Sequence, residues 1–234
     1  MEIVMDIKAI GFDVGHTLIK YNNPLNWGAL YPLALRKVME ECEITETDYR
    51  MQSAISILNK YNTRVYPREY EVSSDNIFTE IFQAWEQEFD RIVKAKKAFY
   101  GFFQAGAICF DDTINVLTEL TAKGIQLGFL TDVAYGMDND YSLADIAAIK
   151  GYFKTGYTSV DVGFRKPNSA GYKMLLDSFD VLPFQMMYVG DEEKDIVGAN
   201  NLGIISVLVN RSEHERLWGQ THTICVLSDL INLV

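Results

Sequence analysis

The chain has 234 residues, which suits one large domain or one domain with a sizeable insertion. Its hydrophobic fraction of 48% and charged fraction of 23% are ordinary for a globular protein, and the net charge of −11 argues against nucleic acid or an anionic membrane as a partner. Three widely separated cysteines suggest free thiols rather than a disulfide framework or a zinc site. Because neither a signal peptide nor an apolar run of ~18 residues is found, we expect a cytoplasmic protein.

The first predicted element is a short strand over residues 7–14. Its sequence, IKAIGFDV, is an apolar run with no polar face before Asp13, which is typical of a strand that is buried on both sides of a parallel sheet. The pattern then changes, and residues 20–106 are predicted to be all-helical because apolar side chains recur at helical spacing. The helices are expected at residues 27–42, 48–61, 77–89 and 90–103.

Strands and helices alternate from residue 107 onwards. Helices are predicted at residues 112–123, 143–150, 169–179 and 195–202, and strands at residues 125–131, 154–159, 185–190, 204–209 and 223–227. This alternation predicts an α/β fold: a doubly wound parallel sheet with right-handed crossovers and an inserted all-helical domain. We divide the chain into a core of residues 1–19 and 107–234 and an insertion of residues 20–106, which would lie over the edge where such sheets bind ligands.

Polar residues stand at or shortly after the ends of several predicted strands. They are Asp13, Thr131, Asp132, Lys166, Asp191 and, four residues further on, Asp195. The carboxyl ends of parallel strands meet at one crevice, so we expect these side chains to gather there although they are far apart in the sequence. Carboxylates together with a hydroxyl and an ammonium group would form a site for an anionic group and a divalent cation.

Four segments resemble, in the same order, the motifs of the haloacid dehalogenase superfamily. They are FDVGHTL (12–18), FLTD (129–132), DVGFRKP (161–167) and YVGDEEKDIVGANNLGI (188–204). In the phosphatases of the superfamily the first motif is usually FDxDGTL and the fourth GDxxxDxxGAxxxG. The resemblance covers residues 7–18 and about 107–210, and the helical block is similar to the family's helical cap in position and length. It implies a Rossmann-like core with a helical cap domain.

The resemblance implies a Mg²⁺-dependent phosphatase that acts on a small phosphorylated metabolite. Asp13 would be the nucleophile and would form an aspartyl-phosphate. The metal ligands would be Asp13, the backbone carbonyl of Gly15, Asp191 and Asp195, the last directly or through water. Asp191 and Asp195 also fit a purely structural role. Asp191 would be the N-cap of the next helix, and Asp195 would be a carboxylate in the first turn of that helix.

The same resemblance assigns further residues to catalysis and substrate binding. Lys166 would pair with the phosphate and with the nucleophile, and the Thr131 hydroxyl would bind a phosphate oxygen, so both would be catalytic and substrate-binding residues. Asp132 and His16 complete the predicted substrate-binding set.

The first motif departs from the family pattern at two positions. The phosphatases usually carry a second Asp two residues after the nucleophile, which protonates the leaving group and later activates water, but Gly15 stands there. His16 stands at the next position, which is usually Gly, and is a candidate for the missing proton donor. Turnover of poor leaving groups is therefore expected to be weakened, since general acid–base catalysis is worth ~10²–10⁴-fold.

Two other functions stay open on the sequence alone. In a haloacid dehalogenase Asp13 would attack carbon; such enzymes also lack the second Asp but need no Mg²⁺, so the carboxylates of GDEEKD (190–195) disfavour this function. A catalytically impaired domain that binds a ligand or partner is the other alternative, supported by Gly15 alone. The substrate and the oligomeric state cannot be read from the sequence, and no nucleic-acid or membrane partner is expected.

Overall fold

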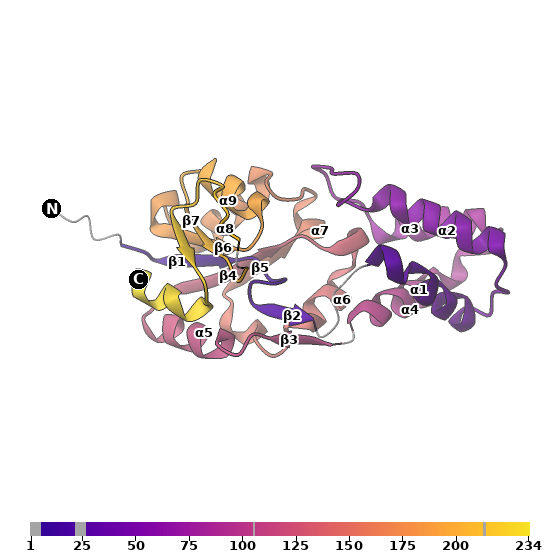
Figure 1. Cartoon of the computed structure of the whole chain (residues 1–234), viewed down its shortest axis with the longest axis horizontal. Coiled ribbons are helices and arrows are strands. Elements are labelled where there is room, and N and C mark those ends of the chain that lie inside the picture. The colour runs from indigo at the N-terminus through magenta and orange to yellow at the C-terminus, as the bar shows by residue number, and fades with distance from the viewer. Residues whose placement is uncertain (1–5, 22–26, 105, 213) are drawn as a thin grey trace.

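The computed structural model describes residues 6–21, 27–104, 106–212 and 214–234. At its centre is a six-stranded sheet with the strand order β5-β4-β1-β6-β7-β8, in which every adjacent pair is parallel (Figure 1). The strands are β1 (Ala9–Phe12), β4 (Gln126–Thr131), β5 (Thr155–Thr158), β6 (Met186–Gly190), β7 (Ile205–Val209) and β8 (His222–Ile224). The sheet grows outward from β1 in one direction through β4 and β5 and in the other through β6 to β8, so the predicted doubly wound α/β fold is confirmed.

Both faces of β1 are buried under helices. The covering elements are α5 (Thr113–Ala122), α8 (Ser169–Phe179), α9 (Glu193–Asn200) and a final 3-10 helix (Leu227–Leu233). Ile10 and Phe12 belong to the apolar cluster that includes α5 and the final 3-10 helix, whereas Ala9 belongs to the cluster with α8 and α9. This alternation follows from strand geometry, and it brings Asp13 to the carboxyl end of a fully buried central strand.

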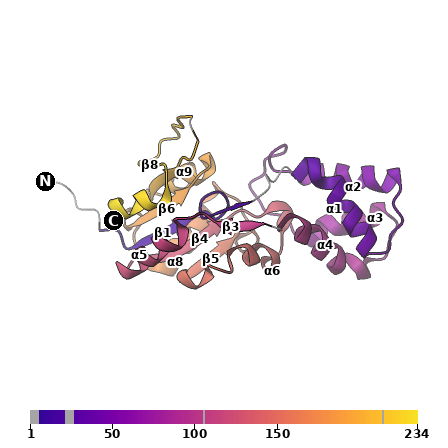
Figure 2. The ribbon, with the colours of Figure 1, turned by 60° about the horizontal axis from the view of Figure 1, so that its bottom comes forward.

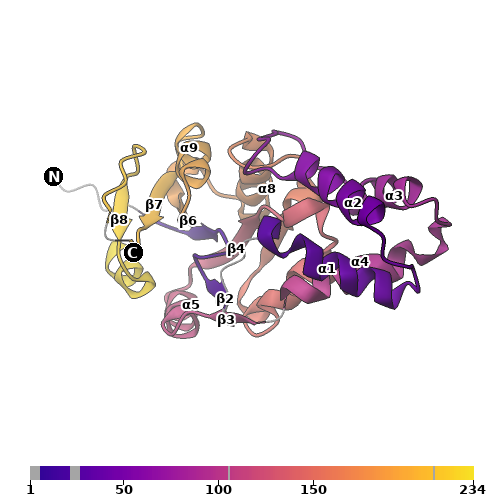
Figure 3. The same ribbon diagram turned by 45° about the vertical axis from the view of Figure 1, so that its right-hand side comes forward.

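The helical insertion lies beyond one end of the sheet, away from the carboxyl terminus, as the three ribbon views show (Figure 1, Figure 2 and Figure 3). Its helices are α1 (Trp27–Glu41), α2 (Asp48–Tyr61), α3 (Ser74–Ala84), a 3-10 turn (Phe89–Arg91) and α4 (Ile92–Gln104). They pack around an apolar core of their own, in which Tyr31, Trp85 and Phe99 are almost fully buried. No helix in the described ranges is long and apolar enough to cross a membrane.

The third helix of the insertion differs from its predicted bounds of residues 77–89. It begins earlier because the Ser73 side chain caps it, accepting a hydrogen bond from the backbone N–H of Asp75 at 3.1 Å. It ends at Ala84, and Glu86 then adopts a φ of 54°. A right-handed helix cannot continue through this left-handed conformation, so the apolar stripe outlasts the helix.

Two short strands stand where no strand was predicted. β2 (Ile19–Tyr21) and β3 (Ala107–Cys109) form an antiparallel pair in which Ile19 lies opposite Cys109 (Figure 1). β2 precedes the helical insertion in the chain and β3 follows it, so the pair holds the two ends of the insertion together. Strands of three residues have too little periodicity to be recognised in a sequence, which explains the wrong prediction.

The link between β4 and β5 is less regular than the predicted helix over residues 143–150. It consists of short turns: Ala134–Gly136, α6 (Asn139–Ser142), Leu143–Ile146 and Lys150–Tyr152. β5 ends at Thr158, whose side chain forms a capping box with Asp161 and so starts the one-turn helix α7 (Ser159–Val162). Another turn, Pro183–Gln185, precedes β6, and the predicted last strand is shortened to β8.

Candidate active site

A cavity of about 930 Å³ lies between the carboxyl ends of the central strands and the helical insertion. Its sheet-side wall includes Asp13, Gly15, His16, Thr131, Asp132, Lys166 and Asp191. Its insertion-side wall includes Trp27, Tyr61, Arg64, Arg68, Phe103 and Gln104. Asp195, the remaining residue of the predicted site, is fully buried behind the wall. The structure therefore brings the predicted site residues together, although they are spread over the chain from Asp13 to Asp195.

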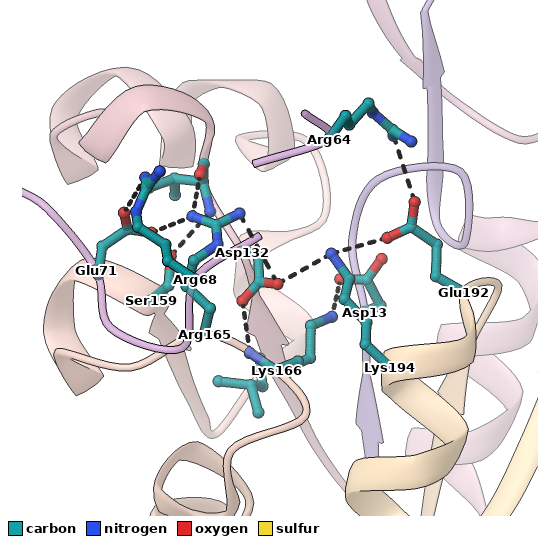
Figure 4. A network of polar contacts seen from close by, with 12 residues as sticks. Asp13, Arg64, Arg68, Glu71, Asp132, Ser159, Arg165, Lys166, Glu192 and Lys194 are labelled. Carbon is teal, nitrogen blue, oxygen red and sulfur yellow. Dashed lines mark hydrogen bonds and ion pairs between the residues drawn. The ribbon is translucent and has the colours of Figure 1, made fainter. Parts of the chain in front are cut away.

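Asp13 and Lys166 form the centre of the site (Figure 4). The backbone N–H of Asp13 donates to the carbonyl oxygen of Val189 at 2.8 Å, which continues the pairing of β1 with β6. The Lys166 Nζ lies 2.5 Å from Asp13 Oδ1 and 2.6 Å from Asp195 Oδ1, and the lysine side chain is only 1% exposed. Burial lowers the pKa of Lys166, but the charges of Asp13 and Asp195 outweigh it and hold that pKa well above its ordinary value. Lys166 is therefore a fixed cation.

Asp13, Asp191 and Asp195 form an acidic cluster, with one carboxylate oxygen of each within 4.8 Å of the others. Burial and repulsion from Asp13 raise the pKa of Asp191 to about 7, and burial raises that of Asp195 to about 6 against the pull of Lys166. The Thr17 hydroxyl donates to Asp191 Oδ1 at 3.3 Å. Crowded oxygen donors whose negative charge is only partly balanced fit a divalent cation of the Mg²⁺ type.

Asp195 makes the helix-start contact that was one of its two predicted roles, while metal binding stays a prediction. Its Oδ2 accepts the backbone N–H of Glu192 at 3.0 Å, which is a helix-capping contact at the start of α9. Its Oδ1 accepts the Lys166 ammonium at 2.6 Å. One oxygen therefore stabilises the helix start while the other belongs to the charged cluster.

Thr131 ends β4 and Asp132 follows it, and both lie in the cavity wall. The Asp132 side chain is 4% exposed; its Oδ2 lies 2.9 Å from Lys194 Nζ, and its Oδ1 accepts the backbone N–H of Lys166 at 3.1 Å. Burial alone would raise the pKa of Asp132. The charges of Lys194, Lys166 and Arg165 act in the opposite direction and are stronger, so this pKa lies below its ordinary value. Asp132 therefore holds the loop that carries Lys166.

Gly15 and His16 form the turn after Asp13. A Cβ built at Gly15 would meet no heavy atom within 4 Å, so the missing side chain is not excluded by crowding. His16 has a φ of 58°, a conformation that favours glycine. Its N–H donates to the Ile19 carbonyl at 2.8 Å and its carbonyl accepts from Arg211 at 2.9 Å, while the side chain is exposed at the cavity wall.

A second charged cluster joins the insertion to the loop before Lys166, and the sequence analysis missed it (Figure 4). Glu71, whose side chain is 2% exposed, forms an ion pair with Arg165 and accepts hydrogen bonds from Ser159 at 2.6 Å and Arg68 at 3.2 Å. Arg165 also donates to the Val133 carbonyl at 2.8 Å. Arg165 stands beside a motif residue, which was a usable signal, but nothing in the sequence pointed to Glu71.

A third contact crosses between the insertion and α9. Arg64 lies 3.3 Å from Glu192 Oε1, and Lys194 lies 2.8 Å from Glu192 Oε2. Lys194 also faces Asp132, so its ammonium links the fourth motif to the second. The signal for Lys194 was its place inside the fourth motif.

Comparison with known proteins shows the family of the chain. The sequence matches the family of haloacid dehalogenase-like hydrolases over residues 37–209. It is 26% identical to the glyceraldehyde 3-phosphate phosphatase of Methanocaldococcus jannaschii, over 97% of each chain. It is 27% identical to the phosphoglycolate phosphatase of Escherichia coli K12, over 86% of this chain and 81% of that one.

Solved structures show the same fold over nearly the whole chain. A HAD phosphatase from Thermococcus onnurineus superposes with a TM-score of 0.67 at 20% identity, covering 97% of both chains. A 2-haloacid dehalogenase from Pseudomonas syringae superposes with a TM-score of 0.70 at 21% identity, again covering 97% of both. Because the family match spans well over half of the residues, the chain belongs to the haloacid dehalogenase-like hydrolases.

Proposed function

We propose that the chain is a Mg²⁺-dependent phosphatase that hydrolyses a small phosphorylated metabolite through an aspartyl-phosphate on Asp13. The observation that carries the proposal is the contact of Asp13 with the buried Lys166 at 2.5 Å, beside the cluster that Asp13 forms with Asp191 and Asp195. A carboxylate nucleophile, a fixed ammonium and an oxygen-donor set for a divalent cation are the parts that phosphoryl transfer requires.

The reaction follows from the residues in two steps. A carboxylate oxygen of Asp13 forms a bond to phosphorus while the bond from phosphorus to the leaving oxygen breaks. Water then attacks the phosphorus of the aspartyl-phosphate, which releases inorganic phosphate and restores the Asp13 carboxylate. Lys166 reduces the repulsion between the nucleophile and the phosphate, and the Thr131 hydroxyl donates to a phosphate oxygen.

The cation would be held by Asp13, Asp191, Asp195 and the backbone carbonyl of Gly15. When bound, Mg²⁺ supplies positive charge that stabilises the phosphoryl oxygens. Asp132 and His16 lie in the cavity wall, and substrate binding by their side chains stays a prediction. A cytoplasmic location likewise stays a prediction of the sequence.

The known relatives and the cavity both support a small phosphate ester as substrate. The two curated relatives are named for glyceraldehyde 3-phosphate and phosphoglycolate, which are small phosphate monoesters. The cavity of about 930 Å³ falls within the roughly 300–1,000 Å³ range of small-molecule sites.

A haloacid dehalogenase is the second candidate function. Two observations favour it: the absence of a carboxylate at Gly15 and the similarity in fold to a 2-haloacid dehalogenase. The acidic cluster of Asp13, Asp191 and Asp195 weighs against it, since attack on carbon needs no divalent cation. A domain that only binds a ligand is disfavoured by the Lys166 ammonium and the acidic cluster around Asp13.

Two parallel assays separate these functions. Phosphate release from an aryl phosphate is measured with Mg²⁺ and after chelation, and halide release is measured from a 2-haloacid under the same conditions. The phosphatase proposal expects phosphate release that chelation abolishes and no halide release. Halide release that survives chelation, without phosphate release, would establish the dehalogenase instead.

A further inference from the structure

The proposed reaction lacks an obvious proton donor for the leaving group. An alcohol oxygen leaves phosphorus poorly unless it receives a proton as the bond breaks. Gly15 has no side chain to supply that proton, and His16 uses its backbone to hold the turn while its side chain is exposed. The walls of the cavity contain other acids that could supply it.

Asp145 is an acid in the same cavity as the nucleophile that forms no ion pair among the residues that the structure describes. It belongs to the 3-10 turn Leu143–Ile146 and lies in the wall of the same cavity as Asp13. The Tyr21 hydroxyl donates to Asp145 Oδ2 at 3.3 Å, and Tyr21 ends β2, the strand that directly follows the Asp13 turn. The carboxyl group therefore has one oxygen oriented by Tyr21 and a second oxygen available to hold a proton.

Tyr21 also lies close enough to the nucleophile for its pKa to respond to the charge of Asp13. Burial and the charge of Asp145 raise the pKa of Tyr21, and the charge of Asp13 adds to the effect. The His16 ring lies 6.0 Å from the Tyr21 ring, between centroids. Tyr21 is thus near the Asp13 turn on one side and in contact with Asp145 on the other.

Asp145 is suited to carry a proton near neutral pH. Burial raises its pKa to about 6, although the hydrogen bond from Tyr21 acts in the opposite direction. General acids work best when their pKa lies near the operating pH. By contrast, Asp132 and Glu192, two other acids in the cavity wall, pair with lysine or arginine, which lowers their pKa and keeps them ionised.

The same end of the cavity has an unsatisfied hydroxyl group. Ser142 Oγ is buried in the wall and has no hydrogen-bond partner within the described part of the chain. Buried hydroxyl groups normally have partners, and this one, with almost no exposed area, is left unpaired beside the cavity. Trp27 and Phe103 provide apolar wall nearby and stack at 3.7 Å between ring centroids. These apolar side chains suit the carbon chain of a small alcohol leaving group.

We propose that Asp145 is the general acid that protonates the leaving oxygen, in place of the side chain that Gly15 lacks, and that Tyr21 positions it. The assignment rests on the proposed phosphatase function. As the phosphorus–oxygen bond breaks, the carboxyl proton of Asp145 moves to the leaving oxygen and gives the free alcohol. The Asp145 carboxylate then takes a proton from the water that attacks the aspartyl-phosphate, which returns it to its starting state.

The test compares two leaving groups in single turnover of the full chain. Asp145→Asn should slow an alkyl phosphate by ~10²-fold or more, because that leaving group needs the proton. It should slow an aryl phosphate much less, since a phenolate leaves without one. Asp140→Asn is the matched control, because Asp140 is an exposed acid on the neighbouring helix α6, and it should change neither rate.

A rescue variant makes the test independent of folding defects. Gly15→Asp added to Asp145→Asn should restore alkyl turnover, since a Cβ at Gly15 meets no obstacle within 4 Å. Equal losses on both esters, or an alkyl rate that survives Asp145→Asn, would overturn the assignment but leave the phosphatase function standing. No phosphate release by the unchanged protein from either ester would overturn the phosphatase function, and the assignment with it.

Discussion

Among the single residues, Lys166 determines the charge balance of the site. Its ammonium group contacts Asp13 and Asp195 at 2.5 and 2.6 Å while the side chain is 1% exposed. Removing this cation leaves two buried carboxylates without an opposite charge, and breaking a buried pair in this way costs about 3–5 kcal/mol. The lysine is therefore expected to support both the fold around the site and the binding of phosphate.

The substitution Lys166→Met tests this dual role. We expect kcat/KM for an aryl phosphate to fall by ~10²–10³-fold, as is typical when one stabilising donor is lost from an active site. The melting temperature should fall as well, because the carboxylates lose their partner. Lys173→Met, at an exposed position on α8, is the control and should change neither quantity. Unchanged kinetics in Lys166→Met would remove the lysine from the mechanism.

Asp145 should leave a signature in the pH dependence of stability. Its folded pKa is about 6 and an unfolded Asp has a pKa of ~3.9, so between these values the folded state binds more protons than the unfolded state. The Asp145 carboxyl group therefore stabilises the folded state at low pH, and this contribution is lost as the pH rises from about 4 to about 6. Relative to the unchanged protein, Asp145→Asn should gain free energy of unfolding on going from about pH 4 to about pH 7. Urea curves measured at both pH values check this, and parallel shifts at the two would contradict it.

The residues that the sequence revealed are those that end strands of a parallel sheet. Asp13 and Asp191 could be placed together from topology alone, because the carboxyl ends of such strands converge. Glu71 could not be found in this way, since its partner Arg165 is 94 positions away and no regular spacing links them. Tyr21 and Asp145 were also missed, because they are 124 positions apart. Tyr21 lies on a strand that was not predicted, and Asp145 lies in an irregular turn.

Among the elements, the segment between α2 and α3 attaches the insertion to the core. The Glu71 N–H donates to the Gly163 carbonyl at 2.9 Å, and the Arg165 N–H donates to the Glu69 carbonyl at 2.8 Å. The buried Glu71 carboxylate adds the ion pair with Arg165, directly before Lys166. The segment therefore holds the loop that carries Lys166, the proposed catalytic lysine.

Glu71→Ala should weaken this attachment. The substitution leaves Arg165 buried without its carboxylate, so we expect the free energy of unfolding to fall by about 3 kcal/mol. The kcat should also fall, because the Lys166 loop loses a support. Glu69→Ala is the control, since Glu69 is exposed and should cost less than about 1 kcal/mol. Similar small losses in the two variants, measured by urea unfolding, would show that the buried pair does not hold the loop.

Helices with a long apolar stripe were predictable, and short elements were not. α1, α2, α4 and α8 lie within one or two residues of their predicted bounds. The pair β2 and β3 escaped notice because its pairing joins residues about 90 positions apart, and pairing, not local periodicity, defines a three-residue strand. The turns between β4 and β5 were mistaken for a helix because their apolar side chains, such as Ile146 and Ile149, are buried at a spacing that a helix would also have.

In the whole molecule, the insertion adds a second wall to the site at the carboxyl ends of the strands. The alternation of strands and helices predicted the sheet and the place of the insertion in the chain, and the ribbon views show the helices beyond the strand ends (Figure 3). The packing of the insertion against the core depends on contacts such as Arg64 with Glu192, which no sequence pattern reveals. The size of the cavity and the acids in its wall follow only from that packing.

The central claim is that Asp13 attacks phosphorus with the help of a divalent cation. The most direct measurement is phosphate release from an aryl phosphate by the unchanged chain and by Asp13→Asn, over a titration of Mg²⁺. Asp111→Asn is the control, because the Asp111 side chain is 99% exposed. We expect Mg²⁺-dependent release from the unchanged chain and the control, and a loss of at least ~10³-fold in Asp13→Asn, since an amide is a poor nucleophile. Undiminished phosphate release by Asp13→Asn would contradict the account.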